Sequence, residues 1–266
     1  MVTTLTPQTW CELSNLLFER DSASGKYRPY VAFRGLSQPY REGELRTGIQ
    51  RISDSTTEYF GRANLPIVER RLIDTFRNYA QEHHPELNND WEVLALARHY
   101  RLCIDWTLSP YVALFFATED PNDWGKDGVI WCAKRDAARE LLPEKLRTVL
   151  EERNTYVFTT RLLRKRLKAL KHLDQDPLLK DAMIWFEPAS ISPRIVNQYA
   201  IFSVMQGVET SQGLYFESNP GLAQRIIIPS RLKPDIHTRL QVMNLSHRTI
   251  YPGLDGIALW LNSYYA

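Results

Sequence analysis

Residues 99–117 read HYRLCIDWTLSPYVALFFA, a group of polar and aromatic side chains followed by an almost unbroken apolar run. Ser109 and Pro110 stand where this run begins, and serine as N-cap with proline as the first helical residue is a common start of a helix. The pattern therefore predicts a buried helix from Pro110 to Ala117. The free backbone N–H groups at its N-terminus, together with the helix dipole, favour a bound phosphate or carboxylate.

Several side chains around this helix start suit an anionic ligand that carries an aromatic ring. Thr107 and Ser109 offer hydroxyl groups, Tyr100 and Trp106 offer flat surfaces, and Arg34 offers a planar cation if its strand runs alongside. The same residues also have purely structural interpretations, because tryptophan and tyrosine often fill the edge of a core. Spacing alone leaves both interpretations open.

Hydrophobic periodicity along the rest of the chain predicts a mixture of helices and short strands. We expect helices over residues 7–20, 65–82, 91–100 and 255–265, a long charged helical segment over 143–173, and strands over 29–36, 127–133, 193–207 and 224–230. In the strand 29–36, alternation places Val31 and Phe33 on one face and Ala32 and Arg34 on the other. The sequence therefore predicts an α+β fold in a single domain, residues 1–266, with a helical N-terminal region and a helical insertion over residues 137–175.

Composition argues against several classes of protein. The 266 residues include 33 Lys and Arg against 31 Asp and Glu, and a net charge of +2 is too small to indicate a dedicated nucleic-acid coat. The three cysteines lack metal-ligand spacing, so we expect neither a disulfide framework nor a metal site. The N-terminus lacks an apolar signal stretch and no apolar run is long enough to span a bilayer, so we expect a cytoplasmic protein without a membrane partner.

A basic segment, RLLRKRLKALKH at residues 161–172, carries six Lys and Arg residues and no acidic residue. Leu162, Leu163, Leu167 and Leu170 can be buried on one face of a helix while the cations remain in solvent. We predict this mainly structural role, because charge runs commonly mark a solvated face. Binding of nucleic acid through the cations is the alternative.

Five ordered motifs resemble those of the FRG domain family, which is named for its Phe/Tyr-Arg-Gly signature. They are AFRGLSQ at 32–38, LRTGIQR at 45–51, ARHYRLCIDWTLSPYVALFFA at 97–117, RIVNQYAIF at 194–202 and YPGLDGIALWL at 251–261. The resemblance covers roughly residues 25–262. Their order is also similar to that of ADP-ribosyltransferase folds, which implies a split β-sheet core and NAD as a substrate.

This likeness implies a role for each predicted site residue. Arg34 anchors the nicotinamide ribose or phosphate, Gly35 accompanies it at the nucleotide, and Gln198 takes the third-motif position. Cleavage of the nicotinamide–ribose bond builds positive charge on the ribose, which a carboxylate can stabilise and the neutral amide of Gln198 cannot. Asp105 or His99 would compensate if it faces the same site. The other residues expected to bind the nucleotide are Tyr100, Trp106, Thr107 and Ser109, and further candidate carboxylates are Glu187, Glu209 and Glu217.

The sequence thus predicts an ADP-ribosyltransferase-like protein that binds NAD or a related nucleotide. It would transfer ADP-ribose to a protein or nucleic-acid acceptor, or hydrolyse NAD, in a defence or toxin context. A non-enzymatic module that senses a nucleotide or mediates an interaction is the first alternative. A nucleic-acid-binding protein that uses the basic segment 161–172 is the second.

Overall fold

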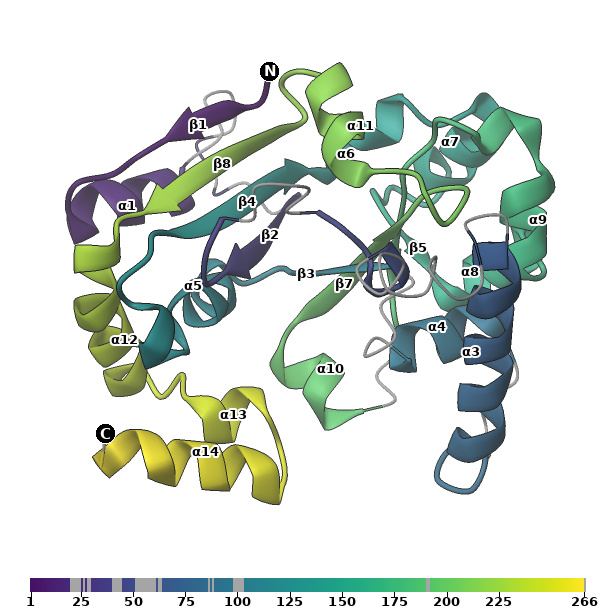
Figure 1. Ribbon diagram of the computed structural model, residues 1–266. Helices are drawn as coiled ribbons and strands as arrows, with labels where there is room; N and C mark the ends of the chain where they lie inside the picture. Colours follow the sequence, from purple (N-terminus) through teal and green to yellow (C-terminus); the bar gives the residue numbers. More distant parts are fainter. Residues whose placement is uncertain are drawn as a thin grey trace.

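The strands of the described chain form one eight-stranded mixed sheet through the middle of the molecule (Figure 1). The computed structural model describes residues 1–19, 25, 27, 30–39, 45–50, 61, 64–85, 87, 89–97, 103–189 and 192–265. In spatial order the strands are β1 (Thr3–Leu5), β8 (Ala223–Ile228), β4 (Gly128–Lys134), β2 (Val31–Leu36), β3 (Ile104–Thr107), β7 (Ala200–Val204), β6 (Ile184–Glu187) and β5 (Phe158–Thr159).

Strand direction is mixed, as the sheet of an α+β fold can be. The two outer pairs, β1 with β8 and β5 with β6, are parallel, and the pairs between them are antiparallel. The helices are α1 (Trp10–Leu17), α3 (Leu65–Ala80), α4 (Asp90–Leu96), α5 (Pro110–Thr118), α6 (Arg135–Glu140), α7 (Glu144–Glu151), α8 (Thr160–Arg166), α9 (Leu170–Gln175), α10 (Pro193–Asn197), α11 (Gln212–Ser218), α12 (Lys233–Val242), α13 (His247–Ile250) and α14 (Leu254–Tyr265), with short 3-10 turns at Pro121–Asp123, Pro177–Leu179 and Ser230–Leu232. The predicted α+β class is therefore confirmed.

Strand β2 separates two hydrophobic clusters, one on each face of the sheet. Ala32 packs in a cluster with Trp106, whereas Phe33 packs in a second cluster with the buried residues of α5, and Val31 joins that second cluster. The alternation predicted from the sequence for these three residues is confirmed. Because α5 lies against β2 on this second face, the start and the end of α5 are both brought next to the central strands.

The start of α5 follows the sequence prediction. Ser109 is the N-cap, its hydroxyl accepts a hydrogen bond from the backbone N–H of Val112, and Pro110 occupies the first helical turn. The helix is apolar all round, and most of its residues are buried between the sheet and α12. Such a helix is held by tertiary burial on several sides rather than by one amphipathic stripe.

The strand predicted over residues 193–207 is wrong in its first part. Residues Pro193–Asn197 form α10, and the strand β7 begins only at Ala200. Ser192 caps this helix by accepting a hydrogen bond from the N–H of Ile195, with Pro193 next to it. The signal is the same Ser-Pro pair that starts α5, and here it outweighs the β-branched residues that favour a strand.

The single long helical segment predicted over residues 143–173 is also wrong. The chain forms α7, then the short strand β5, then α8 and α9. Phe158 of β5 pairs with Phe186 of β6 and is fully buried, so the backbone leaves the helical conformation to extend the sheet. Thr159 then caps α8 through its hydroxyl, which starts a new helix.

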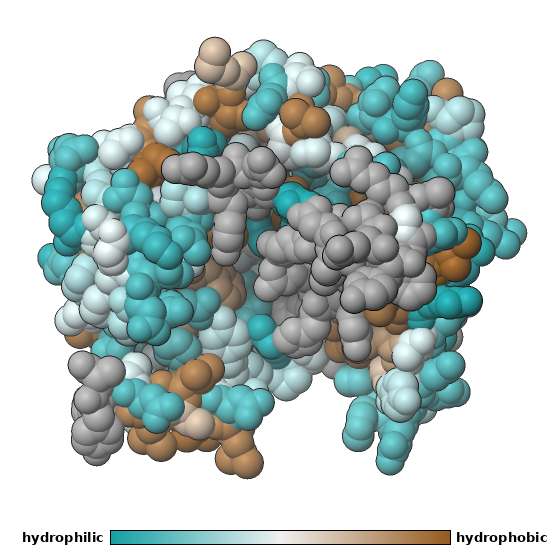
Figure 2. All heavy atoms as spheres, viewed as in Figure 1, coloured by the Kyte–Doolittle hydropathy of each residue, from teal (hydrophilic) through white to brown (hydrophobic). Residues whose placement is uncertain are grey.

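The C-terminal helix α14 carries large apolar side chains that are exposed on the structure. Leu254, Ile257, Leu259 and Leu261 lie on it, and a brown patch covers this region in Figure 2.

Within the described part of the chain, no helix combines the length and the apolar character required to cross a bilayer.

Candidate functional site

A gap between the central strands β2 and β3 holds the first predicted site residue. Only Phe33 of β2 pairs with β3, opposite Thr107, among the residues that the structure describes. Beyond that pair Arg34 Nη1 donates to the backbone oxygen of Asp105 at 2.6 Å and to its carboxylate Oδ1 at 2.5 Å. The arginine side chain therefore joins the two strands where their backbones no longer pair.

The two members of this ion pair differ in their exposure to solvent. The Arg34 side chain is 8% exposed and the Asp105 side chain is 36% exposed. The Arg34 Nε atom is buried and has no hydrogen-bond partner among the described residues. The structure thus brings two predicted catalytic residues together, as a buried cation and a carboxylate that reaches the surface.

Thr107 and Ser109 lie next to this pair but already serve the start of α5. The Thr107 hydroxyl accepts a hydrogen bond from the N–H of Ser109 at 3.0 Å, and Ser109 caps the helix. Both hydroxyl groups therefore shape the turn between β3 and α5. Their contacts are those of the structural interpretation that the sequence left open.

Trp106 lies in the core and offers no open ring face to a ligand. It is 3% exposed, and its ring packs against Trp185 and Phe216. Its Nε1 donates to the hydroxyl of Ser203 at 2.7 Å, and that hydroxyl donates to Gln212 Oε1 at 2.5 Å. The role of Trp106 as a stacking surface for nicotinamide is not compatible with this burial.

Gln198 lies at the C-terminal end of α10 rather than on a strand, which corrects its predicted location. It is 4% exposed, and its Nε2 donates to the backbone oxygen of Ile250, in the last turn of α13, at 3.2 Å. Asn197 makes a similar bond to the backbone oxygen of Thr249 at 2.7 Å. These two amides fasten α10 to α13, so the side chain of Gln198 positions a helix.

Gly35 takes part in packing at this site. A Cβ atom added to it would lie 1.8 Å from the backbone oxygen of Ala113 in α5. Glycine is therefore required where β2 and α5 approach each other. The remaining predicted residues, His99 and Tyr100, lie outside the described residues.

A group of polar side chains that the sequence did not predict lies within electrostatic reach of Asp105, whose charge acts on Tyr251. The Tyr251 hydroxyl donates to Glu119 Oε2 at 2.6 Å, and His247 Nε2 lies 4.0 Å from the same oxygen. The Arg194 guanidinium lies over the Tyr251 ring at 4.8 Å. We call these residues, with the ion pair, the Arg34 cluster: Arg34, Asp105, Glu119, Arg194, His247 and Tyr251.

Electrostatic interactions connect the parts of the Arg34 cluster. The negative charge of Asp105 contributes, after burial and Glu119, to a raised pKa of the Tyr251 hydroxyl. Burial is the main cause that raises the pKa of Glu119 to about 7, and the hydrogen bond from Tyr251 and the charge of Arg194 both oppose it. Burial likewise lowers the pKa of His247. A buried carboxylic acid that titrates near neutral pH is a frequent feature of functional sites.

No local pattern in the sequence identifies Glu119 as special. It follows the last turn of α5 and is partly buried, with 26% of its side chain exposed, where His247 of α13 and Tyr251 pack against that turn. Of the carboxylates suggested from the sequence, Asp105 belongs to the Arg34 cluster, whereas Glu187, Glu209 and Glu217 do not. The signal that could have been used is its position, two residues beyond the predicted end of the helix at Ala117.

We expect Glu119→Gln to remove a pH dependence of stability. The folded pKa is raised from 4.5 to about 7, so the stability is full below pH 4.5 and is lost as the pH rises through 7. At pH 8 the variant should be more stable than the parent by about 2 kcal/mol, and near pH 4.5 the two should be similar. Denaturant unfolding from pH 4.5 to 8.5 measures this difference.

A second variant tests whether the pH dependence of stability comes from Glu119. Tyr251→Phe removes the hydrogen bond that lowers the pKa of Glu119, so the midpoint of the loss of stability should move to higher pH. If the free energy of unfolding changes with pH in the same way for Glu119→Gln and the parent protein, this carboxyl group does not titrate between pH 4.5 and 8.5.

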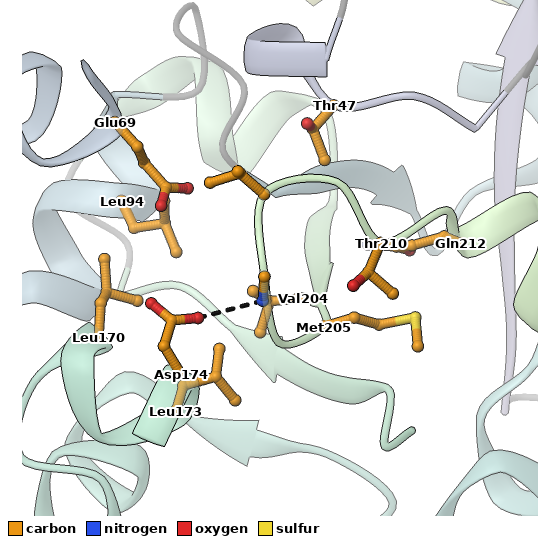
Figure 3. A pocket seen from close by; sticks show the side chains of 12 residues that line it. Thr47, Glu69, Leu94, Leu170, Leu173, Asp174, Val204, Met205, Thr210 and Gln212 are labelled. Carbon is orange, nitrogen blue, oxygen red and sulfur yellow. Dashed lines mark hydrogen bonds between the residues drawn. The ribbon is translucent and has the colours of Figure 1, made fainter. Parts of the chain in front are cut away.

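A small cavity near α3 and α9 contains a second pair of carboxylates (Figure 3). Burial and then the charge of Asp174 raise the pKa of Glu69 to about 8. Asp174 Oδ1 accepts the N–H of Gly207 at 3.1 Å, and Thr47 and Thr210 line the same space. The cavity volume is about 30 Å³, which is enough for about two water molecules. None of the predicted site residues lines it.

The leucines of the basic segment are buried, as predicted. Leu162, Leu163 and Leu167 are buried, and Leu170 packs partly buried against the same core. The cations Arg161, Arg164, Lys165 and Lys168 line an open groove of about 530 Å³ together with Asn89 and Asp90. The leucine face is therefore structural, and the cationic face reaches solvent.

Among the residues that the structure describes, no group of three or more His, Cys, Asp and Glu side chains is arranged to hold a metal ion. The three cysteines are free thiols, of which Cys103 and Cys132 are buried and Cys11 is exposed.

Comparison with known proteins identifies one family. No curated protein and no solved structure matches the chain. The family model of the FRG domain matches residues 29–126, a little over a third of the chain. The match includes the Phe33-Arg34-Gly35 signature, the partner carboxylate Asp105 and Glu119, and it ends before α10 and α13. Residues 29–126 are therefore similar to the FRG domain.

Proposed function

We propose that this protein binds NAD or a related nucleotide in an ADP-ribosyltransferase-like manner, and that the Arg34 cluster is the binding site. The observation that carries the proposal is the position of Arg34. It joins β2 to β3 as the buried partner of the partly exposed Asp105 carboxylate. The charge of Asp105 also acts on Tyr251, which donates a hydrogen bond to Glu119, a carboxyl group with a pKa of about 7.

The charges of the Arg34 cluster suit the polar parts of a dinucleotide. Arg34 and Arg194 are the cations, and a guanidinium can bind phosphate oxygens through two parallel hydrogen bonds. Asp105 and Glu119 are the anions, and carboxylates accept hydrogen bonds from ribose hydroxyls. A site with both kinds of group can hold phosphate and sugar at the same time.

Glu119 takes the chemical role that a glutamine cannot fill. When the bond between nicotinamide and ribose breaks, positive charge develops on the ribose, and a nearby negative charge stabilises that state. The Asp105 charge is already shared with Arg34, whereas Glu119 is bound by the neutral hydroxyl of Tyr251. In this proposal Gln198 acts as a positioning residue, because it holds α10 against α13, from which Arg194 and His247 come.

Replacing Arg34 by lysine tests the binding part of the proposal. Lysine keeps the charge and loses the planar pair of donors, so the affinity for NAD should fall about tenfold. Arg135→Lys is the matched control, because Arg135 is a similarly buried arginine, 5% exposed, whose Nε donates to the backbone oxygen of Tyr30. Titration calorimetry with NAD measures the affinity, and a thermal unfolding scan measures the stability of each variant.

Turnover separates an enzyme from a nucleotide sensor. Mass spectrometry of released nicotinamide, with the parent protein and Glu119→Gln, is the measurement. If the parent protein releases nicotinamide and Glu119→Gln does not, the transferase or hydrolase hypothesis is supported. If NAD binds and no nicotinamide is released, the non-enzymatic module is supported. If neither NAD nor related nucleotides bind at millimolar concentration, or if Arg135→Lys weakens binding as much as Arg34→Lys, the Arg34 cluster is not the nucleotide site.

The basic groove of α8 supports the remaining alternative. Its cations Arg161, Lys165 and Lys168 suit the phosphate groups of a nucleic acid, and none of the described residues that line the groove is aromatic and able to stack on bases. Such a surface would bind a backbone without reading sequence. It therefore supports an acceptor-binding role better than a specific nucleic-acid function.

A further inference from the structure

An apolar cavity of about 220 Å³ lies beneath α1, on the face of the sheet that carries Phe33. Its floor is formed by side chains of three adjacent strands, with Phe33 from β2, Cys132 from β4 and Gln224 from β8. Because strand residues alternate between faces, these three neighbours in register present their side chains to the same space. The cavity is therefore built into the sheet.

The walls of the cavity come from two helices. Leu16 and Leu17 of α1, with Phe18 and Glu19 after it, close one side. Leu108 and Pro110 at the start of α5 close another side. The Phe18 ring contacts Tyr111 with a centroid distance of 5.1 Å and Tyr27 with a distance of 6.0 Å. The lining is apolar and aromatic, which is typical of sites for small organic ligands.

The charged groups of the lining are Lys134 and Glu19. Lys134 is partly exposed at the end of β4, and its ammonium group makes no ion pair with any described residue. Glu19 is exposed, and its charge acts on the Cys132 thiol of the cavity floor. The ammonium group of Lys134 is thus a cation of the lining without an ion-pair partner among the described residues, and it complements an anionic group.

The size of the cavity limits the ligand. A dry cavity of about 150 Å³ holds benzene, so 220 Å³ has room for about nine carbon atoms. We propose that this cavity binds a small monocarboxylate with an apolar or aromatic body, whose carboxylate pairs with Lys134. The site shares no residue with the Arg34 cluster, and Phe33 and Arg34 point to opposite faces of β2, so this proposal does not depend on the proposed function.

Three ligands with one carbon skeleton test the proposal: 3-phenylpropionate, 3-phenyl-1-propanol and 3-phenylpropylamine. The acid should bind to the full chain with a Kd on the order of 0.1 mM, the alcohol more weakly and the amine most weakly. Lys134→Gln should lower the affinity for the acid about tenfold and leave the affinity for the alcohol unchanged. Lys126→Gln, at an exposed lysine outside the cavity, is the matched control and should change neither.

Filling the cavity provides a second test with a different readout. Val31→Phe from the sheet and Leu16→Trp from α1 each place a larger side chain into the space, so each should abolish binding of both the acid and the alcohol. Two variants from opposite walls keep the test valid if one of them fails to fold. Calorimetry gives the affinities, and thermal unfolding shows that a variant is folded.

Several outcomes overturn the proposal. Tighter binding of the amine than of the acid would mean that the cavity takes cations at Glu19. Equal affinity of the acid for Lys134→Gln and for the parent would remove the assigned ion pair. Failure of all three ligands to bind at 10 mM, on the order of a hundred times the expected Kd, would mean that the cavity is not a ligand site.

Discussion

Gly35→Ala is expected to destabilise the folded protein by about 3 to 5 kcal/mol, the largest effect of a single substitution that we predict. The added Cβ would lie 1.8 Å from the backbone oxygen of Ala113 and 2.7 Å from its carbonyl carbon. Backbone atoms in the middle of a buried helix cannot move aside as a flexible side chain can. Either α5 must shift away from β2 or the β2 backbone must bend, and both changes disturb the buried packing between them.

Gly125→Ala is the matched control for this prediction. No atom lies within 4 Å of a Cβ added at Gly125, and its φ angle is not in the left-handed region, so the free energy of unfolding should change by less than about 0.5 kcal/mol. Urea unfolding of the three proteins measures the differences. A stability of Gly35→Ala within 1 kcal/mol of the parent would show that α5 and β2 do not approach as closely as described.

Lys233→Met is expected to cost about 2 to 4 kcal/mol, the second largest effect. Lys233 is completely buried, and its Nζ donates to the backbone oxygens of Ser37 at 2.5 Å and Asp123 at 2.9 Å. Methionine fills a similar volume but leaves both carbonyl groups without this donor. Since Ser37 directly follows β2, the lysine also holds the end of the strand that carries Arg34 against α12.

The nearby Lys126 supplies the control for Lys233. Lys126 pairs with the Asp123 carboxylate at 3.3 Å and is 58% exposed, so Lys126→Met should cost less than about 1 kcal/mol. Thermal and urea unfolding compare the two variants under the same conditions. Equal losses would mean that the buried hydrogen bonds of Lys233 add nothing beyond a surface ion pair.

Part of the site could be predicted from the sequence because the signals for it are local. The start of α5 depends on Ser109 and Pro110 and on the apolar run that follows, all within one or two helical turns. The same rule, applied to Ser192 and Pro193, would have placed α10 correctly. The alternation of residues around Arg34 likewise predicted which side chains lie on each face of β2.

Other features depend on contacts between distant parts of the chain, and a linear pattern contains no information on them. Arg34 and Asp105 lie 71 positions apart, and Glu119 and Tyr251 lie 132 positions apart. Both Trp106 and Gln198 were chosen for what their side chains can bind, and the structure uses each of them for an internal contact. A side chain's chemical capability does not show whether neighbouring elements leave it accessible.

By itself, the sequence determined the α+β class, the Phe33-Arg34-Gly35 signature, the capped start of α5 and the buried leucines of α8, because each follows from residue type and spacing over a few positions. Tertiary structure alone decided that residues 143–173 break into separate helices around β5, and that Glu119 becomes a partly buried acid with a pKa of about 7. The physical reason is that strand pairing and desolvation depend on which surfaces meet after folding. Those energies exceed the local preferences of the segments involved.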